Sequence, residues 1–180
     1  MENLRGHLLI SAAALVDPNF RRTIVLIGEH NDEGALGVVL NRPAPVTVAE
    51  AVPLLASLVA PGDPLFVGGP VQPEAAVVLA EFERPEESGL LVMGSIGFML
   101  GELEPDSIDG IRRARVFAGY SGWGPGQLEA ELEERAWLTD QAVPEDVFAG
   151  SPEALWRSVV RRMGRDFAML ATMPFDPSTN

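Results

Sequence analysis

The stretch that organises this sequence is Gly119-Tyr120-Ser121-Gly122-Trp123-Gly124-Pro125-Gly126-Gln127-Leu128-Glu129, with four glycines, one proline and two large aromatics. The apolar residues 116–118 before it predict the end of a strand. Leucines four apart in residues 128–134 predict the start of a helix. Pro125 suits the first helical position, where its missing N–H costs nothing. We therefore expect a strand–loop–helix corner whose backbone amides point at a bound anion or carbonyl.

Composition limits the class of protein. The chain has 180 residues, 47% of them hydrophobic, which suits one domain spanning residues 1–180. No apolar run is long enough to span a membrane, and no secretory signal opens the chain, so we expect a cytoplasmic protein without a membrane role. Without cysteine, disulfides and thiolate metal sites are excluded.

The charge of the chain argues against nucleic acid as a direct ligand. The formal net charge is −13, whereas affinity for nucleic acid depends on cations that neutralise phosphates. All 13 basic residues are arginines, so a P-loop lysine and a Schiff-base lysine are both impossible. This is an acidic protein in which any cationic site has to be made of arginine.

Hydrophobic patterning predicts a mixture of hairpins and short helices. Residues 23–27 form a β-branched, continuously apolar segment typical of a central strand, and residues 35–40 pair with it across a polar loop over residues 29–34. Thr47 and Glu50 form a capping box before a helix that Pro53 kinks or delays. Further strands are expected at residues 7–10, 65–67, 75–81, 90–93, 115–118 and 136–139, a helical turn at 108–113 and a loop at 143–148.

A final helix is expected from Ser151, which we place at the N-cap with Pro152 at the first helical position. Strands and helices are interspersed without steady alternation. This favours an α+β fold, with a mixed and mostly antiparallel sheet and flanking helices, over a doubly wound sheet.

Nucleophilic and metal chemistry find little support. Gly119–Gly122 nearly follows the Gly-x-Ser-x-Gly nucleophile elbow around Ser121, but Trp123 stands where the elbow needs glycine. His7 and His30 are the only histidines, and their spacing does not suit a zinc site. His30 is either a proton carrier or, as we favour, an exposed loop histidine. We expect no catalytic residue, no metal and no cofactor.

Three other features allow binding and structural interpretations. Gly68-Gly69-Pro70 lets backbone amides approach a ligand, or makes an ordinary sharp turn. In Asn41-Arg42 the guanidinium suits a carboxylate or phosphate, or a surface salt bridge at a turn. Tyr120 and Trp123 either plug the edge of the core or form a recognition surface, and the sequence does not decide between these.

Charged stripes are expected to be solvated helix faces. Arg157, Arg161 and Arg165 lie four apart beside Arg162, which suits nucleic acid or an acidic partner but suits pairing with the many acids of the chain better. The glutamates of residues 129–134 are likewise interpreted as a wet helix face.

Several motifs in order resemble the AlgH/YqgE family of bacterial proteins. They are residues 15–22 (Leu-Val-Asp-Pro-Asn-Phe-Arg-Arg), residues 34–43, Gly68-Gly69-Pro70-Val71 and the stretch from Gly119 to Glu129, followed by Ala136-Trp137-Leu138. The resemblance implies a compact α+β domain whose mixed sheet bends into a partial barrel. It implies no enzymatic reaction and supplies no catalytic residues. The name of one member implies transcriptional regulation of alginate synthesis.

The leading hypothesis is a non-catalytic domain that binds a small anionic ligand or a protein partner. Its candidate site combines the corner, the glycine turn and the end of the hairpin: Asn41, Arg42, Gly68, Gly69, Pro70, Tyr120, Ser121, Trp123, Gly124, Gly126 and Gln127. The alternatives are a transcriptional regulator, acting indirectly rather than by binding DNA, and an unrecognised enzyme. The sequence is silent on the oligomeric state.

Overall fold

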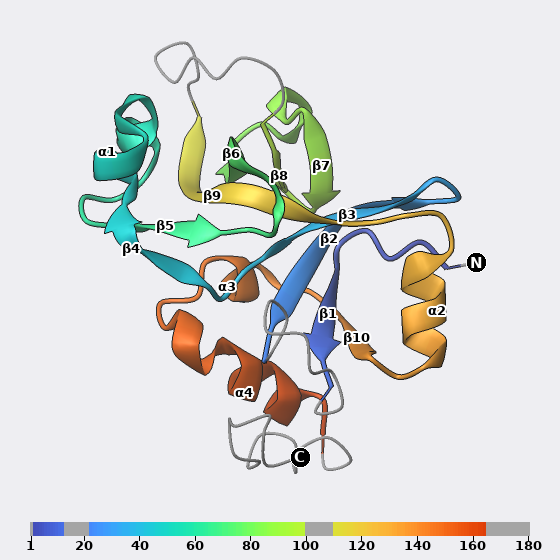
Figure 1. Cartoon of the computed structure of the whole chain (residues 1–180). Helices are drawn as coiled ribbons and strands as arrows, with labels where there is room; N and C mark the ends of the chain where they lie inside the picture. The colour runs from blue at the N-terminus through green and yellow to red at the C-terminus, as the bar shows by residue number, and fades with distance from the viewer. Residues whose placement is uncertain (1, 13–21, 100–109, 165–180) are drawn as a thin grey trace.

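A ten-stranded sheet forms the centre of the molecule. The computed structural model describes residues 2–12, 22–99 and 110–164 (Figure 1). Within these residues the strands follow the order β10-β1-β2-β3-β9-β6-β8-β7, and β4 and β5 join through β9. All pairs are antiparallel except β5 with β9, which is parallel. The sheet is bent but not closed, which confirms the expected α+β class and its mixed, mostly antiparallel sheet.

The first half of the sheet is built around the predicted hairpin. It contains β1 (His7–Ser11), β2 (Ile24–Asn31), β3 (Gly34–Val39) and β10 (Trp137–Gln141). Residues 24–27 are fully buried because β2 lies between β1 and β3 with both faces covered. The expected central strand and its hairpin are confirmed. β2 is longer than expected, since it continues through Glu29 and His30 to a tight turn.

The second half of the sheet contains shorter strands around a long pair. β4 (Pro43–Thr47), β5 (Pro64–Val67), β7 (Leu90–Met93) and β8 (Ile96–Phe98) surround β6 (Val71–Phe82) and β9 (Ile111–Trp123). β6 pairs with β9 from Val71 to Phe82, with irregular register near each end. Residues 111–113, expected in a helical turn, therefore belong to a strand, because β6 supplies their pairing partners. Residues 108 and 109 lie outside the described residues.

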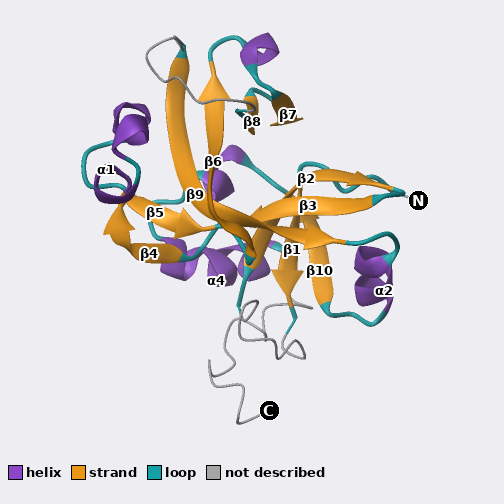
Figure 2. Ribbon diagram, turned by 45° about the horizontal axis from the view of Figure 1, so that its top comes forward, coloured by secondary structure: helices purple, strands orange, loops and turns teal. Residues whose placement is uncertain are grey.

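β9 joins the two halves by changing partners along its length. Its first part pairs with β6 and β5, and its last residues pair with β3 (Figure 2). Gly119, at the change of partner, has a φ of 72°, a conformation that glycine adopts without steric cost. The strand thus continues to Trp123, five residues beyond the end that we expected. Only Gly124-Pro125-Gly126 separates it from α2 (Gln127–Glu133).

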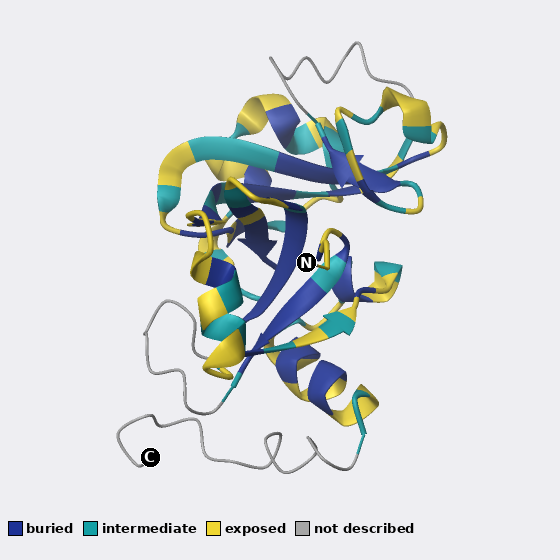
Figure 3. Ribbon diagram, turned by 90° about the vertical axis from the view of Figure 1, so that its right-hand side faces the viewer, coloured by how far each residue is buried: buried dark blue, intermediate teal, exposed yellow. Residues whose placement is uncertain are grey.

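Helices cover both faces of the sheet, and three apolar clusters lie between the layers. α4 (Pro152–Arg162) lies against the face of β1 and β2 that carries Leu8 and Leu26, whereas α2 covers the opposite face, which carries Leu9 and Val25. α1 (Val48–Ala51) and the 3-10 helix η1 (Pro53–Leu58) cover β6 and β9. Figure 3 shows burial concentrated in the strands and exposure at the turns and outer helix faces. None of the helices in the described part of the chain has both the length and the apolar character of a membrane span.

The helix ends test the predicted caps. Thr47 is the N-cap of α1, and its Oγ1 accepts the backbone N–H of Glu50 at 3.2 Å, as expected. α1 ends before Pro53, where a 3-10 helix begins, so the expected interruption is confirmed. Ser151 is at the N-cap position of α4, but its hydroxyl caps no backbone N–H. Its Oγ lies 3.4 Å from a carboxylate oxygen of Glu153 instead.

The described part of the chain contains two further short helices. η2 (Pro85–Glu87) is a 3-10 turn before β7, and α3 (Pro144–Val147) occupies the segment expected to be a loop. α3 forms because Asp146 accepts the N–H of Val143 at 2.9 Å and so caps its first turn.

Candidate functional site

Three arginines from distant parts of the sequence line one cleft of about 780 Å³. Arg22 precedes β2, Arg42 follows β3, and Arg157 lies on α4. We call this site the arginine cleft. Its remaining walls are Asn41, Pro43, Ala44, Pro45, Val67, Glu153 and Trp156. Among the described lining residues there is one carboxylate, that of Glu153, against three guanidinium groups, in a chain whose net charge is −13.

Arg22 and Trp156 form the back of the cleft. The guanidinium carbon of Arg22 lies 4.9 Å from the centre of the Trp156 ring, in cation–π geometry. The indole N–H of Trp156 donates to the backbone carbonyl of Ser11 at 3.2 Å and fixes the ring. Burial and the positive charge of Arg157 lower the pKa of Arg22 below its usual range. An anion bound between Arg22 and Arg157 would be attracted by both guanidinium groups.

Asn41 and Arg42 enter the cleft where the hairpin ends. The Oδ1 of Asn41 accepts the N–H of Ile24 at 3.0 Å, and its Nδ2 donates to the carbonyl of Arg22 at 2.9 Å. Arg42 donates from Nη2 to the Oγ1 of Thr23 at 3.0 Å. These contacts tie the end of β3 to the start of β2. The side chain of Asn41 therefore links the two strands by hydrogen bonds, and Arg42 is held in position on the cleft wall.

Gly68 and Gly69 pack directly against the start of the Gly119–Glu129 stretch. A Cβ on Gly68 would lie 2.3 Å from the carbonyl oxygen of Gly119, and one on Gly69 would lie 2.2 Å from that of Tyr120. The hydroxyl of Ser121 is 1% exposed and donates to the carbonyl of Gly68 at 3.1 Å. The structure thus brings these two predicted segments together, but as backbone in contact with backbone. Pro70 is exposed beside them.

The end of this stretch satisfies its own polar groups. Trp123 is 7% exposed and packs edge-on against Trp137, and Glu131 accepts the indole N–H groups of both, at 3.3 and 2.9 Å. The N–H of Gly124 donates to the Oε1 of Gln127 at 3.0 Å. The sequence left two alternatives for Trp123, packing at the edge of the core or forming a recognition surface. The structure shows that it packs at the edge of the core.

The start of α2 also differs from the expected geometry. Gly126, with a φ of 75°, is the N-cap of α2, so Pro125 precedes the helix rather than opening it. Trp123 and Gly126 do not line the arginine cleft. Of the candidate residues, Asn41 and Arg42 lie on the cleft, whereas Gly68, Gly69 and most of the Gly119–Glu129 stretch build a structural corner.

His30 is buried rather than exposed in a loop. Its Nδ1 accepts the N–H of Leu4 at 3.1 Å, so the proton of the neutral ring is on Nε2, which donates to Glu129 at 2.6 Å. This hydrogen bond lowers the pKa of Glu129 below its ordinary value. Both ring nitrogens are occupied, and the pair connects β2 to α2. The prediction of an exposed His30 was wrong because its partner lies far away in the sequence.

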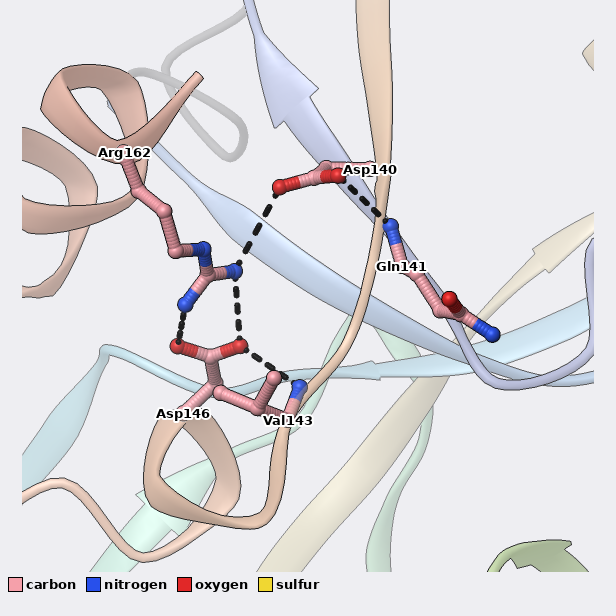
Figure 4. A network of polar contacts seen from close by, with 5 residues as sticks. All are labelled: Asp140, Gln141, Val143, Asp146 and Arg162. Carbon is pink, nitrogen blue, oxygen red and sulfur yellow. Dashed lines mark hydrogen bonds and ion pairs between the residues drawn. The ribbon is translucent and has the colours of Figure 1, made fainter. Parts of the chain in front are cut away.

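The arginines of α4 have different surroundings. Arg162 makes two hydrogen bonds to Asp146, at 2.9 and 3.0 Å, and lies 3.5 Å from Asp140 (Figure 4). These carboxylates raise the pKa of Arg162. Arg162 thus pairs with acids, as expected, and joins α4 to β10 and α3. Arg157 faces the cleft instead, and Arg165 lies outside the described residues.

A second concavity lies where β9 changes partners. This pocket of about 290 Å³ is lined by residues of both halves of the sheet, and Tyr120 is part of its wall. The two aromatic residues of the corner therefore differ in their surroundings. Trp123 packs in the core, and Tyr120 lines an accessible pocket.

The sequence did not identify Arg22, Trp156 and Arg157 as parts of one site. Arg22 closes a quoted motif, and Arg157 belongs to the arginine stripe, so both were visible as cations. Helical spacing shows which residues of α4 share a face, but not which segment lies opposite that face. Cationic residues are outnumbered by acidic ones in this chain, so a more useful signal would have been the position of each arginine.

The fold and its cleft define an α+β protein with an open, bent sheet and an arginine-lined surface site. The chain belongs to the AlgH-like family, whose model matches residues 8–168. This confirms the resemblance found in the sequence.

Relatives of known sequence and structure match nearly the whole chain. A UPF0301 protein of Streptomyces coelicolor is 44% identical over 100% of this chain and 97% of its own length, and one from Mycobacteroides abscessus is 42% identical over 97% and 87%. A crystal structure of a Corynebacterium diphtheriae protein has a TM-score of 0.86 at 27% identity, covering 96% of this chain and 94% of its own. The solution structure of the AlgH protein from Pseudomonas aeruginosa has a TM-score of 0.70 at 32% identity, covering 96% and 95%. These names state no reaction and no ligand.

Proposed function

We propose that this protein binds a small anionic molecule, carrying phosphate or carboxylate groups, in the arginine cleft and does not transform it. The observation that carries the proposal is the convergence of Arg22, Arg42 and Arg157 on one cleft of an acidic protein. Guanidinium groups suit planar or tetrahedral oxyanions because they offer several N–H donors in a fixed fork. The apolar wall of Pro43, Pro45 and Val67 would contact the body of the ligand.

The surroundings of the polar groups support binding rather than catalysis. Ser121 is buried and donates to a backbone carbonyl, and both nitrogens of His30 are engaged away from the cleft. The described lining of the cleft contains no serine, histidine or tyrosine, and its one carboxylate is that of Glu153. Positioned donors without a nucleophile fit recognition of an anion.

The test is a thermal-shift screen with pyrophosphate, citrate, ATP and a 20-nucleotide single-stranded DNA. A ligand present at about 100 times its dissociation constant adds about 2.7 kcal/mol to the free energy of unfolding. We expect at least one of the small anions to stabilise the protein. Stabilisation by the DNA alone, with steep salt dependence, would instead support the regulator hypothesis in its direct form.

Matched variants locate the binding site. Arg157→Ala should weaken binding of the hit at least ~10-fold in calorimetry, corresponding to about 1.4 kcal/mol for one charge-assisted contact. Arg161→Ala is the control, since Arg161 is exposed on the same helix and does not line the cleft. Equal weakening by both variants would indicate diffuse charge attraction and overturn the proposed site, as would no stabilisation by any anion.

A further inference from the structure

The pocket beside Tyr120 is formed by the bend of the sheet. Gly37 and Val38 of β3 form one wall, and Val77 of β6 and Phe98 of β8 form the other. Tyr120 lies on β9 directly after Gly119, where the strand changes partners and passes from one wall to the other. The pocket therefore lies between the two halves of the unclosed sheet and is concave and mainly apolar, as small-molecule sites usually are.

A β-bulge shapes the rim of this mouth. The register of β2 against β3 shifts between Ile27 and Glu29, so Gly28 is an extra residue in β2. A Cβ on Gly28 would lie 2.5 Å from the ring of Phe98, so only glycine lets that ring lie against β2. Glu29, which follows the bulge, forms part of the lining of this pocket and also of a smaller cavity beside Trp123. The rim thus brings a carboxylate to an otherwise apolar cavity.

The chemistry of the lining is opposite to that of the arginine cleft. The walls are mainly aliphatic and aromatic, with Leu36, Val77, Leu90, Phe98 and Met99 among them, and the part of the lining that the structure describes contains no arginine. The Tyr120 hydroxyl makes no hydrogen bond, and the Glu29 carboxylate no ion pair, to any residue in the described ranges. The lining of this apolar pocket therefore includes two polar residues that lack such partners among the described residues.

We infer that this pocket is a second binding site, for a one- or two-ring apolar molecule that carries a protonated amine or a hydroxyl group. Its volume of about 290 Å³ is at the small end of ligand pockets, which span roughly 300–1,000 Å³. The ring system fills the apolar walls, and the amine or hydroxyl donates to Glu29 or exchanges a hydrogen bond with Tyr120. An anionic ligand is disfavoured because Glu29 repels it and the described lining residues include no cation.

Tyr120 provides a direct reporter because it is the only tyrosine of the chain. The experiment follows the ring signals of 13C-labelled Tyr120 by NMR during titration with 2-naphthylmethylamine, 2-naphthol and 2-naphthoate. These three probes share a ring system and differ in charge. We expect saturable shifts with the amine and the naphthol, and at least ~10-fold weaker binding of the naphthoate at this site. Binding of naphthoate in the arginine cleft would leave the Tyr120 signals unchanged.

Variants separate charge from shape. Glu29→Gln should remove most of the preference for the amine over the naphthoate. Val77→Phe should abolish binding of all three by filling the cavity, and Leu36→Trp should obstruct its exposed rim should the first variant fold poorly. Leu54→Ala, at an exposed position away from the pocket, is the matched control.

Two results would overturn the inference. One is the absence of saturable Tyr120 shifts with every probe. The other is equal affinity for the amine and the naphthoate in the parent protein. Because the readout is confined to Tyr120, neither result affects the proposal for the arginine cleft.

Discussion

The Gly119–Glu129 corner and the arginine cleft differ in how their polar side chains are engaged by the rest of the protein. In the corner, Ser121 donates to a backbone carbonyl, the indole of Trp123 donates to Glu131, and Glu129 accepts from His30. In the described lining of the cleft, three guanidinium groups share a concave surface with the carboxylate of Glu153. Most of the described polar groups of this distinctive segment therefore serve the architecture, whereas the cleft that we propose as a binding site is assembled from residues scattered along the chain. Local distinctiveness of a sequence thus does not show which residues converge on one cleft.

The sharpest test of this contrast is Trp123→Ala. Trp123 is buried against Trp137 and Leu128, and removal of a buried aromatic leaves a cavity. We expect the free energy of unfolding to fall by about 3–5 kcal/mol in urea denaturation. Affinity for an anion in the arginine cleft should stay within about twofold while the variant is folded. A loss below ~1 kcal/mol would mean that the corner does not support the core.

A smaller effect is expected from Gly68→Ala. The new methyl group would meet the carbonyl oxygen of Gly119 at 2.3 Å, so the two segments would have to move apart. Overpacking of this kind costs about 1–3 kcal/mol. Gly150→Ala is the matched control, since a Cβ there meets nothing within 4 Å. Equal stability of the two variants in thermal denaturation would contradict the close approach of the backbones.

The next effect depends on pH and involves Glu129. Its hydrogen bond from His30 lowers its pKa below the ordinary value of 4.5. The stabilising contribution is therefore complete above the unfolded pKa and is lost as pH falls through the folded pKa. Glu129→Gln should lower stability by about 1 kcal/mol at pH 7, with the difference narrowing below about pH 5.

Glu133→Gln controls for general charge effects in this experiment, because Glu133 is exposed on the same helix. Urea denaturation of the parent and both variants between pH 7 and pH 3.5 measures the effect. A difference for Glu129→Gln that stays constant over this range would refute the His30–Glu129 assignment.

The smallest effect on stability is expected in the cleft. Arg157 is exposed and forms no ion pair with the described residues. Arg157→Ala should change the free energy of unfolding by less than about 0.5 kcal/mol. The same variant is the one expected to lose anion binding. Loss of both properties together would place Arg157 among the structural groups and remove the contrast between the two regions.

Local sequence signals predicted the parts of the fold that depend on near neighbours. The β2–β3 hairpin and the Thr47 cap involve residues close in sequence, and both are confirmed. The course of β9 was not predictable in this way, because its glycines suggest a loop. They extend as a strand since β3 offers pairing partners from residues 35–37. Tertiary pairing overrides local preference here.

The candidate site was predictable only in part for the same reason. Arg42 was a candidate anion ligand from its residue type and position, with a surface salt bridge as the alternative, and it lies on the arginine cleft. His30 was misplaced because its partner Glu129 lies 99 residues away. Arg22 and Arg157 meet only after α4 packs on β1 and β2, an arrangement that periodicity does not specify.

The pairing of β1 with β10 has a consequence for how the chain reaches its native state. His7 pairs with Gln141, and Ala35 of β3 pairs with Trp123 of β9. Contacts between such distant residues form only after long loops have closed, at a cost in entropy. This slows folding to roughly milliseconds to seconds. During synthesis, β1 has to wait for most of the chain before its outer edge is covered. Until then the edge is an unpaired template to which other strands can add.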